Sequence, residues 1–344
     1  DGSIASITNN GLLKITGVGS VTVTATSTKT GYDDQTATWT LYAEKKPVTA
    51  VVTAQSKTYD GNSTATVIAE LNASDLVDGD TFTITLSGSF EDPNAGTDKK
   101  VKVDSSNPQF STGSTVHENY RITYPSTTTA SIFKADVDET KLTLPTAKSG
   151  LEYTGLAQVL VGTEGSSPDG IVEYSLDGKI YSASLPTGTD AGDYEVWYRV
   201  KGDSNHNDTA GTKLDNKVTI APQTVNTPII EFTPSNIEFD GKMHKPAVAV
   251  KDNEGRVIPA TEYETTYDAT TDWTSARAHK VTITDKEGGN YTFSETEKNF
   301  TILPAGQGAL SIVNQPGRVQ YGDTFTLAVS GGTVAGAVTW TSSD

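Results

Sequence analysis

Four histidines are the side chains of this 344-residue chain that could exchange a proton near neutral pH and also bind a transition-metal ion. They lie in four separate stretches, and none has acidic partners at the spacing of a metal site. Cysteine is absent, so the sequence excludes thiol nucleophiles, thiolate metal sites and disulfide bonds. We therefore expect no enzyme activity, no catalytic residues, and solvated positions for His117, His206, His244 and His279.

Two loops are rich in the oxygen ligands that calcium prefers. The stretch SDLVDGDT carries Asp75, Asp78 and Asp80, and GDSNHNDT carries Asp203 and Asp208 together with two asparagines. Neither loop has the spacing or the terminal glutamate of an EF-hand. We interpret both as polar loop tips that bind no cofactor, and calcium between neighbouring domains is the alternative.

Two tryptophans are candidates for a different kind of contact. Alternation in DYEVWYRVK places four apolar side chains on one face of a strand and Trp197 on the other, among charged residues. Trp197 could stack on a sugar ring, or it could pack on a neighbouring domain or on the stem of an arginine. Trp340 in VTWTSS alternates with Val338, which favours packing inside a core.

The net charge of the chain indicates which classes of partner it can bind. The chain has 43 acidic and 26 basic residues, a formal charge of −17, and the acidic residues are dispersed. Binding to nucleic acid or to anionic lipid requires clustered lysine or arginine, so both are excluded as expected partners. No apolar run approaches the ~20 residues that span a bilayer, so we expect no membrane insertion within this segment. No signal peptide is recognisable, and we expect any export or anchoring signal to lie outside it.

The elements that position these residues are predicted to be β-strands. In TFTITLSGSF, Phe82, Ile84, Leu86 and Phe90 alternate with threonine and serine, which is typical of a half-buried strand. The same alternation recurs at residues 21–26, 194–200, 280–284 and 324–330. No stretch has the 3.6-residue periodicity of a helix. Asp177 and Gly178, between two alternating segments, predict a two-residue hairpin turn.

An aromatic residue followed two positions later by glycine recurs along the chain. The aromatic positions are 82 to 94 residues apart, about the length of one small β-sandwich. A closing strand recurs at similar intervals, at Ile132, Ile220 and Ile302. Repetition at the same place in every unit indicates a structural role, in which the ring covers one end of a core and glycine takes a positive φ. These positions are Tyr59 and Gly61, Tyr153 and Gly155, Phe239 and Gly241, and Tyr321 with a shifted Gly322.

At these landmarks the sequence resembles bacterial immunoglobulin-like (Ig-like) surface repeats. KTYDGN with its later NAG and closing ENYRITYPSTTTASIFK resembles the YDG and MBG repeats, and the next two units resemble relatives of it. The opening GSIASITNNGLLKITGVGSVTVTATS is similar to the second half of a group 2 bacterial Ig-like domain, and the closing stretch through VTWTSSD resembles the first half. The resemblance implies antiparallel Ig-like sandwiches in secreted or wall-attached bacterial proteins, with no catalytic residues.

The expected organisation is an all-β tandem array of antiparallel Ig-like β-sandwiches that forms an elongated rod. The expected function is a structural stalk or spacer in an extracellular protein, secreted or on the bacterial cell surface. The alternative is an adhesin segment that binds glycans or a surface protein through exposed aromatics such as Trp197. The predicted units are residues 1–44 (half-domain), 45–135, 136–221 and 222–304 (complete sandwiches), and 305–344 (half-domain).

The two half-domains predict a partner. Each leaves an uncovered apolar face and unpaired strand edges, which recruit further strands. We expect the closing half of one copy to complete the opening half of the next, either within a longer polypeptide or between chains. Contacts of this kind between chains assemble head to tail into a fibre unless they close into a ring.

Overall fold

The computed structural model is built of β-strands and a few short 3-10 turns, which confirms the all-β class for the residues it describes. The chain divides into two compact units, each made of three stretches. Unit 1 comprises residues 1–145, 164–184 and 197–213, and unit 2 comprises residues 146–163, 185–196 and 214–344. The structure describes residues 4–77, 79–111, 116–270, 272–332 and 336–343.

Unit 1 is organised around one six-stranded sheet with the strand order β6-β8-β9-β10-β12-β7. Strands β15, β18 and β19 form a second sheet, and β1–β2, β3–β4 and β5–β11 form pairs. The elements of unit 1 are β1 (Ala5–Ile7), β2 (Leu13–Ile15), β3 (Gly19–Ser27), β4 (Gln35–Ala43), β5 (Lys46–Thr49), β6 (Val51–Ala54), β7 (Lys57–Thr58), β8 (Thr64–Glu70), η1 (Ala73–Asp75), β9 (Ile84–Phe90), β10 (Gly96–Phe110), η2 (Val116–Asn119), β11 (Tyr120–Thr123), β12 (Thr127–Phe133), η3 (Glu139–Lys141), β15 (Gly170–Ser175), β18 (Trp197–Gly202) and β19 (Thr212–Lys213).

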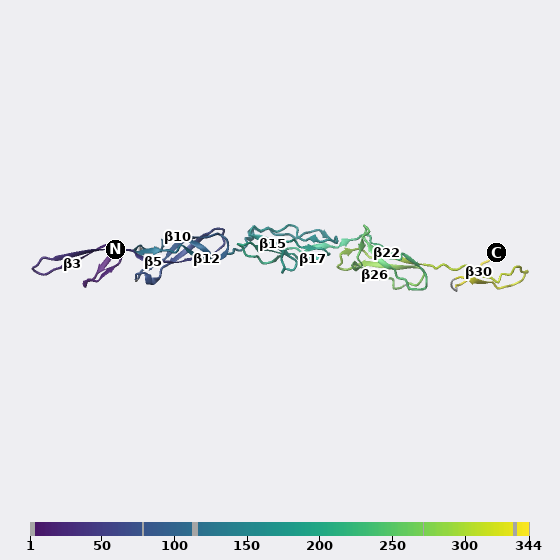
Figure 1. The fold of residues 1–344 in the computed structure, drawn as a ribbon. Helices are drawn as coiled ribbons and strands as arrows, with labels where there is room; N and C mark the ends of the chain where they lie inside the picture. The colour runs from purple at the N-terminus through teal and green to yellow at the C-terminus, as the bar shows by residue number, and fades with distance from the viewer. Residues whose placement is uncertain (1–3, 78, 112–115, 271, 333–335, 344) are drawn as a thin grey trace. The chain divides into compact units, whose positions relative to one another are not determined.

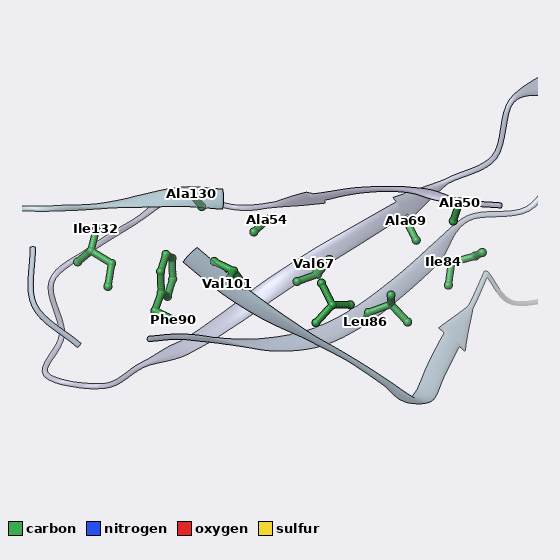
Figure 2. Packing of buried hydrophobic residues seen from close by; sticks show 11 residues of the cluster. Ala50, Ala54, Val67, Ala69, Ile84, Leu86, Phe90, Val101, Ala130 and Ile132 are labelled. Carbon is green, nitrogen blue, oxygen red and sulfur yellow. The ribbon is translucent and has the colours of Figure 1, made fainter. Parts of the chain in front are cut away.

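The core of this sheet follows the alternation of its strands. In β9, Ile84, Leu86 and Phe90 are buried while the threonine and serine residues between them are exposed, as the sequence predicts. Figure 2 shows these side chains together with Val67 of β8 and Val101 of β10, which are fully buried. The burial of apolar surface between neighbouring strands is the main force that holds this sheet together.

The hairpin of β3 and β4 pairs over nine residues of each strand and lies near the start of the chain (Figure 1). Its aromatic side chains are largely exposed, with Trp39 at 61% and Tyr42 at 69%. The hairpin therefore has an uncovered apolar surface.

Unit 2 contains a four-stranded sheet, β23-β29-β27-β26, and two three-stranded sheets, β13-β20-β17 and β22-β24-β25. The pairs are β14–β16, β21–β28 and β30–β31. The elements of unit 2 are β13 (Leu151–Glu152), β14 (Gln158–Val159), β16 (Thr187–Gly188), β17 (Gly192–Tyr194), β20 (Val218–Ala221), β21 (Gln223–Thr224), β22 (Ile229–Thr233), β23 (Asn236–Glu238), β24 (Ala247–Lys251), β25 (Val257–Ile258), η4 (Ala260–Glu262), β26 (Tyr263–Tyr267), β27 (Ala278–Asp285), β28 (Tyr291–Thr292), β29 (Thr296–Leu303), β30 (Leu310–Val313) and β31 (Ala328–Gly331).

The four histidines are less solvated than expected: His117, His206 and His244 are half-buried, and His279 is enclosed in the core. His279 in β27 is fully buried, stacks on Trp273 with ring centroids 4.7 Å apart, and its Nε2 lies 2.9 Å from the carbonyl oxygen of Ser275. Alternation in β27 places this side chain on the same face as Val281 and Ile283, which are also buried. His279 is therefore a hydrogen-bonded core residue.

Three local predictions differ from the structure. The strand predicted over 194–200 is divided, because β17 ends at Tyr194 and β18 begins at Trp197. The strand predicted over 324–330 is shorter, since β31 spans Ala328–Gly331 and pairs with β30 alone. The turn at Gly178 is wider than a two-residue hairpin: its flanking antiparallel pair is Tyr174 and Ser182.

Candidate functional site

The three aromatic-glycine turns share one backbone arrangement. Each follows a short strand that pairs in parallel with a closing strand: β7 with β12, β13 with β20, and β23 with β29. Parallel pairs were not expected in an antiparallel sandwich, and they need a long connection between the two strands. The glycines Gly61, Gly155 and Gly241 have φ angles of 78°, 75° and 77°, which favour glycine.

The parallel pairs bring the two repeating sequence landmarks together. The backbone N–H groups of Tyr59, Tyr153 and Phe239 donate to the carbonyls of Phe133, Ala221 and Leu303, each at 2.8 Å. These acceptors directly follow Ile132, Ile220 and Ile302, which are all at most 1% exposed. The turns are therefore anchored beside buried closing strands at three places in the chain.

The rings of the first two turns contact a residue far along the sequence. Tyr59 meets the ring of His206 edge-on with centroids 5.4 Å apart, and Tyr153 meets Tyr291 in the same way at 5.4 Å. Burial raises the pKa of Tyr153, and the nearby carboxylates of Glu262 and Asp190 raise it further. Phe239 of the third turn is 40% exposed.

The first acidic loop uses its carboxylates in contacts with the protein itself. Asp75 ends η1 and accepts a hydrogen bond from Asn72 Nδ2 at 3.3 Å, and Asp80 accepts one from the Tyr120 hydroxyl at 2.6 Å. Burial raises the pKa of Tyr120, and its hydrogen bond to Asp80 raises it further. Asp78 lies outside the described residues.

The carboxylates of the second acidic loop are similarly engaged. Asp203 accepts from the backbone of Asn205 at 2.8 Å, and its Oδ1 lies 2.8 Å from His206 Nδ1. Burial acts to raise the pKa of Asp203, but these two hydrogen bonds outweigh it and leave the pKa below its ordinary value. Asp208 accepts from the backbone of Gly202 at 3.0 Å.

These contacts do not assemble a metal centre. Within the described ranges, no three histidine, aspartate or glutamate side chains converge in a way that would hold a metal ion. Calcium between neighbouring domains stays the alternative interpretation of these two loops.

Trp197 is half-buried at the start of β18. Gly178 lies directly against its indole, since a methyl group added to Gly178 would be 2.9 Å from Trp197 Cε2. The ammonium of Lys213 lies 5.0 Å from the ring centroid. Part of the surface that a sugar ring would need is therefore occupied by the protein's own groups.

Trp340 is 46% exposed and lies outside the strands of unit 2. Together with Phe325 and Leu327 it lines a shallow hollow near the end of the described chain. Its expected packing in a complete core stays a prediction.

From the sequence, Asn205 is interpreted only as part of a polar loop with candidate calcium ligands, and Asn290 is assigned no contact role. Each makes side-chain hydrogen bonds to a residue about 100 positions away. Each asparagine directly precedes the residue whose ring meets a turn tyrosine, His206 or Tyr291. The sequence signal that could have identified them is an asparagine followed directly by a residue with a ring, Asn205-His206 and Asn290-Tyr291, ahead of a closing strand. We call this pair the asparagine-ring dipeptide.

Comparison with protein families agrees with part of the expected resemblance. Residues 44–130 match the model of the YDG domain. No curated protein matches the chain. Among the described residues, no helix is both long enough and apolar enough to cross a membrane.

Proposed function

We propose that this chain, in which residues 44–130 form a YDG domain, is a non-catalytic spacer segment of a large extracellular bacterial repeat protein. The observation that carries the proposal is the recurrence of one anchored turn at Tyr59, Tyr153 and Phe239, each held by the same backbone hydrogen bond to a closing strand. Repetition of one structural unit favours a role that depends on the number of units rather than on one special site.

The proposal includes the arrangement of the strands into domains. The three turns mark three Ig-like sandwiches in a row, each with a small core of its own, and the row forms an elongated rod on the cell surface or on a secreted protein. Its acidic surface, with a formal charge of −17, favours solubility and disfavours anionic partners. In this proposal the carboxylates of both acidic loops act in local hydrogen bonding and bind no cofactor.

The proposed partners are neighbouring copies or modules of the same protein. Apolar side chains are exposed in both terminal segments, including Leu12 at 68%, Trp39 at 61% and Phe325 at 52%. We place the closing segment of one copy against the opening segment of the next, where these faces would cover each other. Sedimentation velocity should then show larger species as the protein concentration rises, and Trp340→Ser should reduce them. A monomer at every concentration would contradict this contact between free chains.

Small-angle X-ray scattering of the full chain tests the spacer proposal directly. A row of sandwiches gives a pair-distance distribution with an early maximum and a long tail, whereas a compact particle gives a symmetric one. Measurement at the lowest usable concentration removes the contribution of assembly between copies. A symmetric distribution under those conditions would overturn the rod and, with it, the role as a spacer.

A further inference from the structure

Two asparagines form the same contact in two different parts of the chain. In unit 1, Asn205 Oδ1 accepts a hydrogen bond from the backbone N–H of Ala95 at 2.9 Å, and its Nδ2 donates to Asn94 Oδ1 at 3.2 Å. We call this set, with Tyr59 and His206, junction 1. Its residues all lie in unit 1, although about 110 positions separate the two sides.

Junction 2 repeats this arrangement inside unit 2. Asn290 Oδ1 accepts from the backbone N–H of Ala191 at 2.7 Å, and its Nδ2 donates to Asp190 Oδ1 at 3.2 Å. The aromatic pair here is Tyr153 with Tyr291.

The backbone around each asparagine is also paired in the same way. The N–H of Ala135 donates to the carbonyl of Asn205, and the N–H of Gln223 donates to the carbonyl of Asn290, both at 2.9 Å. Ala135 and Gln223 each lie three residues after a closing-strand isoleucine. Both junctions therefore combine one backbone bridge, one aromatic pair and one asparagine side chain.

The chemistry of the two junctions selects asparagine. A primary amide offers one acceptor oxygen and an NH₂ donor on the same side chain. The opposing turn offers a backbone N–H from alanine and a side-chain oxygen from the residue before it. Asn205 is 9% exposed, so both of its polar groups need partners inside the protein.

We propose that Asn205 and Asn290 are docking residues that couple each predicted sandwich to the one before it, by binding the turn at Asn94–Ala95 and the turn at Asp190–Ala191. The surface that they recognise is an aromatic-glycine turn beside the backbone N–H of a half-buried alanine. The partner that fits it is the asparagine-ring dipeptide of the following unit. This coupling is carried by contacts within each unit, and only the description of the coupled parts as sandwiches rests on the proposed function.

The two junctions differ in charge, and the difference makes the proposal specific. Asn290 faces the carboxylate of Asp190, and its side-chain and backbone N–H groups also donate to Glu262. In junction 1 the corresponding residue is Asn94, whose neutral amide can turn to donate instead of accept. Asn290→Asp would therefore bring a third carboxylate toward those of Asp190 and Glu262, whereas Asn205→Asp would face one carboxylate, that of Asp203, and the neutral amide of Asn94.

Hydrogen exchange of the two alanine amides in the full chain, followed by NMR, tests the coupling. Asn290→Ala should accelerate exchange at Ala191 by roughly tenfold, the effect of losing one hydrogen bond, and leave Ala95 unchanged. Asn205→Ala should do the reverse. At neutral pH, Asn290→Asp should accelerate exchange at Ala191 more than Asn205→Asp accelerates it at Ala95, and adding Asp190→Asn to Asn290→Asp should restore part of the protection.

The Asn290 variants have a control for folding in neighbouring strands. Amides in β27 and β29 report on the segment that contains Asn290, and they should stay protected in both Asn290 variants. Unchanged exchange at Ala191 in Asn290→Ala would overturn the proposal. If Asn205→Ala or Asn290→Ala accelerated exchange equally at Ala95 and Ala191, the proposal would also be overturned. Loss of protection throughout β27 and β29 would have the same consequence. In both cases the asparagine would support the general fold instead of one junction.

Discussion

Asp177 lies in a loop whose hydrogen bonds strongly favour its charged carboxylate. Its Oδ1 accepts hydrogen bonds from the backbones of Lys179 and Ile180 at 2.8 and 2.9 Å, and from the Ser175 hydroxyl at 2.8 Å. The backbone N–H of Ile180, followed by that of Lys179 and the Ser175 hydroxyl, lowers the pKa of Asp177 from 3.8 to about 2. These bonds favour the charged carboxylate over the protonated one.

The pKa of Asp177 leads to a prediction about pH. A carboxyl with a lower pKa in the folded state stabilises that state fully above its unfolded pKa, near 3.8, and this contribution is lost as the pH falls toward about 2. A carbon-detected NMR titration should show the Asp177 carboxyl titrating near 2.

Substitution of one donor supplies the control for this titration. Ser175→Ala removes the hydroxyl that donates to Asp177 and that accepts from the backbone N–H groups of Asp177 and Gly178, so it should raise the pKa of Asp177 toward its ordinary value. Asp272, whose pKa is lowered to about 2 chiefly by the Ser275 hydroxyl, should be unaffected. A midpoint near 3.8 for Asp177 in the folded chain would show that the loop is not organised as described.

Sequence reasoning at the scale of single residues succeeded where the cause was local. Glycine two positions after an aromatic residue predicted a positive φ, and Gly61, Gly155 and Gly241 all have one. The burial of His279 depends on Trp273, which is 2% exposed and reaches the core with a φ of 53°. Trp273 is only six positions before His279, but a search for metal-ligand spacings does not examine which face of a strand a residue occupies, so it could not find this burial.

Strand β9 allows a prediction at the scale of one element. A methyl group on Gly88 would lie 2.9 Å from the carbonyl oxygen of Lys102 and 2.9 Å from Val67 Cγ2. Gly88→Ala should therefore overpack the sheet and cost about 1–3 kcal/mol. Native-state hydrogen exchange of the β9 amides gives this free energy directly.

An exposed neighbour in the same strand is the matched control. Ser89 points to the solvent face, so Ser89→Ala should change the stability by less than about 0.5 kcal/mol. Equal effects of the two substitutions would contradict the close packing of β8, β9 and β10 around Gly88.

The same alternation explains which elements the sequence could predict. The alternation of apolar and polar residues located β9, and the structure confirms its buried face at Ile84, Leu86 and Phe90. It could not predict the interruption between β17 and β18, because alternation continues through a break in pairing. Alternation also could not predict the parallel strand pairs, because the relative direction of two strands is decided by the connection between distant segments. The docking asparagines were missed for the same reason: their partners are about 100 positions away.

At the scale of the whole chain, the separation of the cores determines how stability is distributed. A cluster of buried side chains in unit 1 includes Leu86, and a cluster in unit 2 includes Phe300, which meets Phe232 edge-on with centroids 5.7 Å apart. Repeated units that each bury their own core unfold nearly independently, with additional terms from their nearest neighbours.

Two core substitutions test this independence. Leu86→Ala should cost about 2–5 kcal/mol and Phe300→Ala about 3–5 kcal/mol, because each leaves a cavity in a buried cluster. Hydrogen exchange should then accelerate in β8, β9 and β10 for Leu86→Ala, and in β27 and β29 for Phe300→Ala, with little change in the other set. If both substitutions accelerated both sets equally, the chain would unfold as one cooperative body and the two cores would not be independent sources of stability. If each substitution accelerates exchange only in its own set of strands, stability is local. A destabilised segment then opens while the segments beyond the nearest junction remain folded.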